Sequence, residues 1–150
     1  MKSSKKLEKI NDWHPPKSPY GLIQEELYED PWKILVACVF CNLTRRFTAE
    51  PIMREFFDLY PTPNDAMNAN ASRLEEMLKP IGLSARRAKT LIRMSKEYLE
   101  KDWKEPIELY GIGKYGNDAW KIFCTPDWKN VQPKDHALNW YHDWLIANYA

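Results

Sequence analysis

The chain has 150 residues, of which 44% are hydrophobic and seven are tryptophan, and its formal net charge is +1. These values exclude a largely disordered chain and favour one domain with a substantial core, while the small net charge alone gives no signal for nucleic-acid binding. No stretch reaches the roughly 20 uninterrupted apolar residues of a membrane helix, and the first residues lack an apolar signal segment. We therefore expect a soluble, intracellular protein with a flexible arm at residues 1–12 and one domain at residues 13–150.

The predicted elements begin with an extended segment and a short helix. Residues 13–20 contain three prolines and are predicted to lie extended against the domain. The stretch GLIQEELYED that follows is predicted to form a short helix with its apolar residues facing inward. Asp30 and Pro31 then give the cap and first-turn signals of a helix. Because WKILVACVF is almost entirely apolar, this helix is predicted to be central.

Cys38 and Cys41 form a CxxC pattern inside this apolar run. A zinc site would need a second pair of ligands, and the chain contains no other closely spaced pair of the right kind. The odd number of cysteines also does not suggest a disulfide framework. We therefore interpret the two cysteines as core residues and expect no metal site.

The middle of the chain is predicted to contain three more helices. Pro51 is predicted to begin the first of them, and a short helix follows at about Ser72 to Leu78. Ser84 is predicted to cap a long helix at residues 85–102. The inward stripe of this long helix is predicted to comprise Ala88, Leu91, Ile92, Ser95, Tyr98 and Leu99.

Positive charge is concentrated in one segment of the chain. Residues 79–104 contain eight basic and three acidic residues, which gives this segment +5 and leaves −4 for the rest. A basic segment beside a glycine-rich turn is typical of DNA binding, and a solvated helix face is the alternative interpretation.

Two features near the C-terminus make chemical sense together. Gly111-Ile112-Gly113 precedes a helix predicted at residues 117–123, so that backbone N–H groups are predicted to point at an anion such as phosphate. Asp135, 24 residues after Gly111, stands directly before the last helical pattern. A fixed carboxylate near a phosphate site favours a reaction that develops positive charge on the substrate, such as cleavage of a glycosidic bond. An ordinary helix cap is the alternative role for Asp135.

Four segments carry a resemblance to a known family: DPWKILVACVFCNLT, KPIGLSARRAKT, WKEPIELYGIGKYGNDAW and DHALNWYHDWL. They resemble the catalytic domains of the methyl-CpG-binding-domain thymine/uracil mismatch DNA glycosylases, within the helix-hairpin-helix DNA glycosylase superfamily. The resemblance runs from about Trp13 to the C-terminus and implies an all-helical fold with two lobes around a substrate cleft. Several members of the superfamily hold an iron–sulfur cluster with four closely spaced cysteines, which this chain lacks, so no cluster and no other cofactor is expected.

The resemblance implies specific roles at the centre of the site. Asp135 is the expected catalytic residue, which either stabilises positive charge on the sugar or activates the attacking water. Gln24 is expected in the base pocket, where its amide reads the Watson–Crick edge of a pyrimidine, and Tyr115 is expected to line the same pocket. Bifunctional relatives carry a nucleophilic lysine at the position of Tyr115, so no lyase activity is expected.

The resemblance also implies a set of DNA contacts. Leu83 matches the residue that wedges into the base stack, whereas Leu43 stands where close relatives have an arginine that fills the space of the flipped nucleotide. Arg45 or Arg46 is the alternative for that filling role. The full set of expected DNA-binding residues is Leu43, Leu83, Arg86, Arg87, Lys89, Gly111, Gly113, Lys114 and Gly116.

The expected function is therefore that of a monofunctional DNA glycosylase of base excision repair. It would remove thymine or uracil from G·T and G·U mismatches in double-stranded DNA by base flipping and hydrolysis. The resemblance further implies a nuclear protein, and we expect a monomer that does not bind membranes. A glycosylase for another damaged base, a non-catalytic helix-hairpin-helix DNA-binding module and a protein-interaction bundle are the alternatives.

Overall fold

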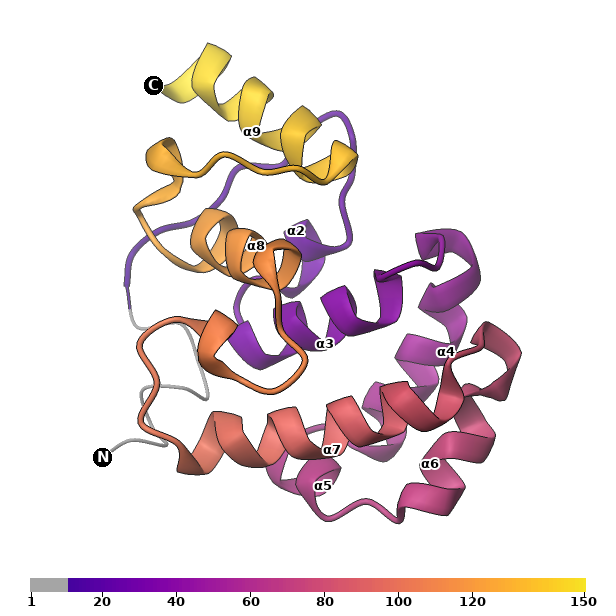
Figure 1. The fold of residues 1–150 in the computed structure, drawn as a ribbon. Coiled ribbons are helices and arrows are strands. Elements are labelled where there is room, and N and C mark those ends of the chain that lie inside the picture. Colours follow the sequence, from indigo (N-terminus) through magenta and orange to yellow (C-terminus); the bar gives the residue numbers. More distant parts are fainter. Residues whose placement is uncertain (1–10) are drawn as a thin grey trace.

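The computed structural model describes residues 11–150, which fold into helices joined by loops and contain no strand (Figure 1). The predicted all-helical fold is confirmed. Residues 1–10, which make up most of the predicted flexible arm, lie outside the described residues. The elements are α2 (Gln24–Leu27), α3 (Pro31–Cys41), α4 (Arg46–Leu59), α5 (Pro63–Met67), α6 (Ala71–Leu78), η1 (Lys79–Ile81), α7 (Ser84–Glu100), η2 (Pro106–Glu108), α8 (Lys114–Cys124), η3 (Trp128–Asn130) and α9 (His136–Tyr149).

Helix α3 is the centre of the fold, as its apolar sequence predicts. The Asp30 carboxylate accepts hydrogen bonds from Trp32 N and Lys33 N, and Pro31 occupies the first turn, so the predicted cap is present. Nine residues of α3 are buried. One side of the helix packs on α4 and α7 and the other side packs on α8, so α3 separates two hydrophobic cores. These cores are the two predicted lobes.

The first lobe consists of α4 to α7, with α7 as its long edge helix (Figure 1). Trp32 Nε1 donates to Ser95 Oγ at 2.9 Å and ties α3 to α7. Helix α4 begins at Arg46 rather than at the predicted Pro51, which lies inside the helix. The helix continues through Pro51 because the carbonyl that loses its partner is that of Phe47, on an exposed turn where water can bond it.

The start of α7 also differs from the prediction. Ser84 is the first helical residue and not the cap. Leu83 occupies the cap position with φ +50° and provides no side-chain cap hydrogen bond. A leucine in this left-handed conformation is not predictable from residue preferences, which favour a serine cap.

The second lobe consists of α2, α8, η3, α9 and the extended segment at residues 13–20. That segment crosses the lobe as predicted: Trp13 stacks on Trp128 at 5.6 Å between ring centroids, and Tyr141 Oη donates to Pro16 O at 2.7 Å. Helix α8 begins at Lys114, three residues before the predicted start at Asn117. Residues 114–116 therefore form its first turn.

Cys38 is a core residue as predicted, whereas Cys41 is only partly buried and belongs to neither hydrophobic core. Cys38 is buried between α3 and α8, and burial raises the pKa of its thiol well above the ordinary value. Burial also raises the pKa of Cys41, to about 11, so both thiols are neutral. Within residues 11–150, no group of three or more His, Cys, Asp or Glu side chains is arranged for a metal ion, and no helix is long and apolar enough to cross a membrane.

Candidate functional site

The glycine turn before α8 has a conformation and a neighbour that both require glycine. Ile112 N donates to Leu109 O at 3.1 Å and closes a four-residue turn, in which Gly111 has φ +75°. A Cβ atom at Gly111 would lie 2.5 Å from Thr90 Cγ2 of α7. The hairpin therefore packs directly on α7 and can do so only with glycine at this position.

The turn leaves the N-terminus of α8 open as a candidate anion site. Gly113 is the N-cap, and a Cβ atom there would meet nothing within 4 Å, so an anion can approach its backbone. The first N–H groups of α8, those of residues 114–116, have no partner within the helix. Lys114 adds a positive charge beside them, although its Nζ is 2.8 Å from Asp118 Oδ2. The lysine is half-exposed but the aspartate is largely buried, so the ion pair offsets part of the charge of Lys114.

Gly116 has a packing role in addition to the one expected from the sequence. It is buried, and a Cβ atom there would lie 3.0 Å from Ile112 Cγ2 and 3.8 Å from Cys38 Cβ. Its missing side chain therefore allows α8 to pack closely on the hairpin and on α3. Only the backbone N–H of Gly116 belongs to the anion site.

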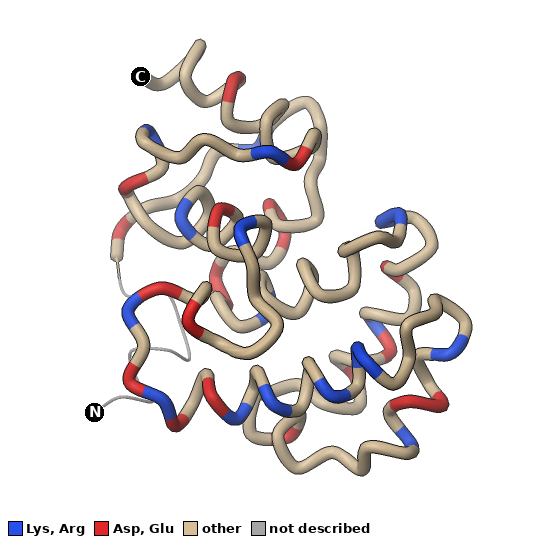
Figure 2. Tube along the Cα trace, in the orientation of Figure 1, with Lys and Arg blue, Asp and Glu red and all other residues tan. Residues whose placement is uncertain are grey.

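A pocket of about 320 Å³ lies in front of this turn, between the end of α3 and the start of α7. Arg86 and Leu83 line it from α7 and the preceding turn, and Asn42 lines it from the end of α3. Basic residues continue along α7 from this pocket (Figure 2). Lys89 Nζ lies 5.6 Å and Arg93 Cζ 4.2 Å from the ring centroid of Tyr110, the residue before Gly111. The predicted basic segment thus borders the glycine turn.

Arg87 also lines this pocket, but its guanidinium is already bonded to the protein, so its expected DNA contact remains a prediction. Its side chain turns inward, and the residue is 4% exposed. All three guanidinium nitrogens donate to protein oxygens.

A second pocket, of about 340 Å³, contains both the residues expected to recognise the base and the residue expected to act on the sugar. Gln24, Tyr115 and Asp135 all line it, from α2, α8 and the start of α9. Gln24 is 2% exposed, and its Nε2 donates to Tyr115 Oη at 3.2 Å. Burial raises the pKa of Tyr115 far above its ordinary value, so the ring is a neutral phenol that can both donate and accept. The family resemblance implied a shared base pocket for Gln24 and Tyr115, and the structure brings these two residues and Asp135 to one pocket. Their roles remain predictions.

Asp135 is both a helix cap and a pocket residue. Its Oδ2 accepts a hydrogen bond from Leu138 N at 3.0 Å, which is the geometry of an N-cap. The same carboxylate borders the pocket that contains Gln24. The cap and the chemical interpretation are therefore compatible, because the cap fixes the orientation of a charged group at the pocket wall.

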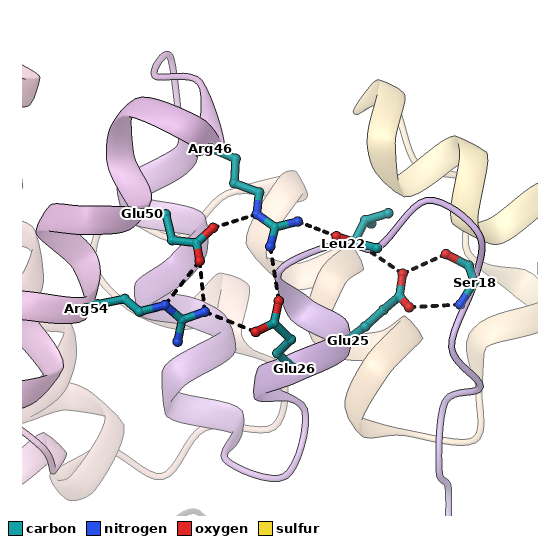
Figure 3. Close-up of polar contacts among 8 residues, drawn as sticks. Ser18, Leu22, Glu25, Glu26, Arg46, Glu50 and Arg54 are labelled. Atoms are coloured by element: carbon teal, nitrogen blue, oxygen red, sulfur yellow. Dashed lines mark hydrogen bonds and ion pairs between the residues drawn. The ribbon is translucent and has the colours of Figure 1, made fainter.

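Charged side chains hold the loop and helix that carry Gln24 (Figure 3). Arg46 and Arg54 of α4 both pair with Glu50 and with Glu26 of α2, at 2.9 to 3.1 Å. Arg46 also donates to Gly21 O. The hydrogen bond from Arg46 contributes most to lowering the pKa of Glu50 below its ordinary value. Because the guanidinium of Arg46 is engaged in these bonds, it is not free to fill the space of a flipped nucleotide. Arg45, which is exposed, remains the alternative to Leu43 for that role.

Two leucines beside the pockets have left-handed backbones. Leu43 has φ +62° and is 83% exposed, and Leu83 has φ +50° and is 47% exposed. Leucine in this conformation costs roughly 1–2 kcal/mol. The Leu43 side chain, which is almost fully exposed, gains little from burial to offset this cost. Such strain is typical of functional sites. Nothing in the sequence signals it.

Two aromatic residues at the rim of the second pocket were not predicted from the sequence. Tyr20 and Trp140 line this pocket with their ring centroids 6.0 Å apart, and about half of each side chain is exposed. Trp140 follows Asp135 by five residues, which is about 140° around a helix, so helical spacing from Asp135 gave no signal for it.

The sequence matches a family described as the HhH-GPD superfamily of base excision DNA repair proteins, over residues 42–142. This chain belongs to that superfamily. The matched residues include both leucine turns, the glycine turn and Asp135, so the features assembled above are those of a helix-hairpin-helix base excision repair domain. Gln24 lies outside the match.

Curated relatives are longer than this domain. The methyl-CpG-binding domain protein 4-like protein of Arabidopsis thaliana is 39% identical over 139 residues, which are 93% of this chain and 31% of that protein. A thymine-DNA glycosylase of Aeropyrum pernix is 36% identical over an alignment of 97 residues that covers 57% of this chain and 42% of that protein. The chain therefore spans less than half the length of these relatives.

Solved structures confirm the fold. A thermostable thymine-DNA glycosylase superposes with a TM-score of 0.61 at 18% identity, covering 87% of this chain and 70% of that one. Endonuclease III, in a trapped covalent intermediate with DNA, gives a TM-score of 0.56 at 21% identity, covering 62% and 47%. The two-lobed helix-hairpin-helix architecture predicted from the sequence is thus the fold of this domain.

Proposed function

We propose that this domain is a monofunctional DNA glycosylase that removes thymine or uracil from G·T and G·U mismatches in duplex DNA. The observation that carries the proposal is the second pocket, in which an amide, a neutral phenol and a helix-capping carboxylate meet beside an anion site. The names of the relatives, a thymine-DNA glycosylase among them, support a pyrimidine as the substrate. A mispaired base costs less to unpair than a matched one, which contributes to selectivity.

Asp135 would act where the N-glycosidic bond breaks. Positive charge grows on the deoxyribose as the base departs, and a fixed carboxylate at the pocket wall stabilises that charge or activates a water molecule. Its hydrogen bond from Leu138 N holds one oxygen in place, so the group needs little rearrangement during the reaction. The backbone N–H groups at the start of α8 would bind a phosphate of the same strand and position the sugar.

Gln24 and Tyr115 would recognise the base. An amide offers both a donor and an acceptor, which suits the imide N–H and carbonyl oxygens of uracil and thymine. Among residues 11–150, no lysine lines the pocket that contains Asp135, and Lys114 lines the neighbouring pocket instead. A Schiff base with the sugar would require such a lysine, so we infer hydrolysis without strand cleavage.

The direct test is excision from duplex oligonucleotides that carry one target base each. We expect the domain to release uracil and thymine opposite guanine, leaving an intact abasic strand that alkali then cleaves. Excision of an oxidised or alkylated purine in place of these pyrimidines would contradict the proposal, and so would binding without any excision. Borohydride should trap no covalent complex, and an adduct that is lost in Lys114→Ala would contradict the monofunctional assignment.

Leu43→Arg tests the residue at which this chain departs from its relatives. The exposed leucine offers only apolar contact to the DNA. The flipped nucleotide should therefore be populated mainly when the target base is weakly paired. The wild-type domain should therefore excise uracil from G·U much faster than from A·U. In Leu43→Arg the ratio of the excision rates on G·U and A·U should decrease. The slope of log affinity against log salt concentration should become steeper by about 0.9 for one added phosphate contact.

The assay is single-turnover excision on the two duplexes, with binding measured at several salt concentrations. Leu59→Arg is the matched control, because Leu59 is also an exposed leucine, at the far end of α4. If Leu43→Arg leaves both the ratio and the salt slope unchanged, residue 43 does not enter the DNA.

A further inference from the structure

The guanidinium of Arg87 lies between the two leucine turns. On one side Nη1 donates to Ile81 O and Gly82 O, each at 2.8 Å, directly before Leu83. On the other side Nη2 donates to Asn42 O at 2.6 Å and to Thr44 Oγ1, the residues that flank Leu43. One planar group thus bonds the neighbours of both left-handed leucines.

The remaining bonds of Arg87 fix the guanidinium itself. Nε donates to Val39 O at 3.4 Å and Nη2 also lies 3.5 Å from Phe40 O, so the group caps the C-terminal carbonyls of α3. The positive charge is favourable there because it complements the negative end of the α3 dipole. The first backbone bond of α7, from Arg87 N to Leu83 O at 2.8 Å, ties the same residue to the second turn. Arg87 therefore connects α3, α7 and both turns.

We infer that Arg87 is a positioning residue that holds Leu43 and Leu83 in their strained, exposed conformations, so that the two turns meet DNA as one rigid unit. This inference rests on the proposed function, in which the leucines take part in displacing the target base. The geometry supports it because both leucines have positive φ and both lie next to oxygens that accept from Arg87. A lysine could not replace the arginine, since it lacks the planar fork that reaches both sides.

A double-mutant cycle separates positioning from simple stabilisation of the fold. Single-turnover excision of uracil from G·U is measured for the wild type, Arg87→Lys, the pair Leu43→Ala/Leu83→Ala, and the combination of all three changes. We expect Arg87→Lys to slow excision about tenfold, which is less than the roughly 10²-fold that follows a displacement of 1 Å. With both leucines truncated, the same change should slow excision less than about twofold, because interacting residues are not additive.

A second readout uses the strength of base pairing. Uracil opposite an abasic site has no partner base to displace, so Arg87→Lys should slow its excision much less than excision from G·U. Arg54→Lys is the matched control, because Arg54 also uses its guanidinium to join two helices but lies in the ion-pair cluster of α4. Because Arg54 holds α2 and thereby Gln24, any loss from Arg54→Lys should be equal for the two substrates and should leave the ratio of their excision rates unchanged.

The outcomes distinguish the inference from the proposed function. No excision by the wild-type domain contradicts the proposed function itself. The positioning role is overturned if the wild type excises uracil and Arg87→Lys lowers the excision rate by the same factor in both leucine backgrounds and on both substrates. If Arg87→Lys does not fold, Thr44→Val takes its place in the cycle, since it removes one acceptor from the fork and should give a smaller effect of the same pattern.

Discussion

Asp135→Asn is expected to retain DNA binding and to lose excision by about 10²- to 10⁴-fold, the range of a positioned general base. Asparagine caps helices as well as aspartate does, so the hydrogen bond from Leu138 N and the start of α9 should survive. The substitution removes the negative charge that faces the developing positive charge on the sugar. The measurement is single-turnover release of uracil from G·U, together with the affinity for the same duplex.

Asp143→Asn is the control for this prediction. Asp143 is an exposed aspartate on the same helix, so the change in net charge is identical and only the position differs. We expect wild-type excision from the control. Turnover near that of the wild type by Asp135→Asn would exclude both a base and an electrostatic role for this carboxylate, and the site would have to be sought elsewhere in the pocket.

The parts of the fold that follow from local rules could be predicted from the sequence. Asp30-Pro31 before an apolar run specifies a capped central helix, and the prolines of residues 13–20 specify an extended segment. Asp135 before a helical pattern specifies an N-cap, and the structure contains it. That Gln24 lies beside Tyr115 followed only from the family resemblance, because a contact between residues 91 positions apart in the chain leaves no local signal.

The parts that could not be predicted depend on tertiary contacts. In the sequence, Arg87 is one of several basic residues on a helix. Its buried position depends on backbone carbonyl groups of two other segments, which include Ile81 and Asn42. The left-handed conformations of Leu43 and Leu83 contradict residue preferences and are maintained by surrounding bonds. The start of α4 was misplaced because proline usually begins a helix, whereas Pro51 is accommodated within one. In each case the tertiary environment overrides a local preference.

Gln24→Met tests whether the amide reads the base. Methionine has nearly the length of glutamine but neither donates nor accepts a strong hydrogen bond, so a bound pyrimidine would leave its imide N–H and a carbonyl oxygen unpaired. A site that hydrogen-bonds its substrate can lose about 10⁴- to 10⁵-fold in rate when that pairing is removed. This loss is larger than the loss that an apolar pocket suffers from a missing methylene. With Tyr115 still present, we expect excision of uracil from G·U to fall by about 10²-fold or more.

This loss should appear in excision and not in stability or product binding. The buried amide bonds only Tyr115 Oη and Cys38 Sγ among the described residues, the latter at 3.9 Å, so an apolar side chain of similar volume should leave the melting temperature nearly unchanged. Affinity for an abasic duplex should also persist, because that product has no base to contact Gln24. Gln132→Met, at an exposed position, is the control and should behave as the wild type. If Gln24→Met excises uracil as fast as Gln132→Met does, the amide does not read the base, and recognition must rest on Tyr115 and the backbone around the pocket.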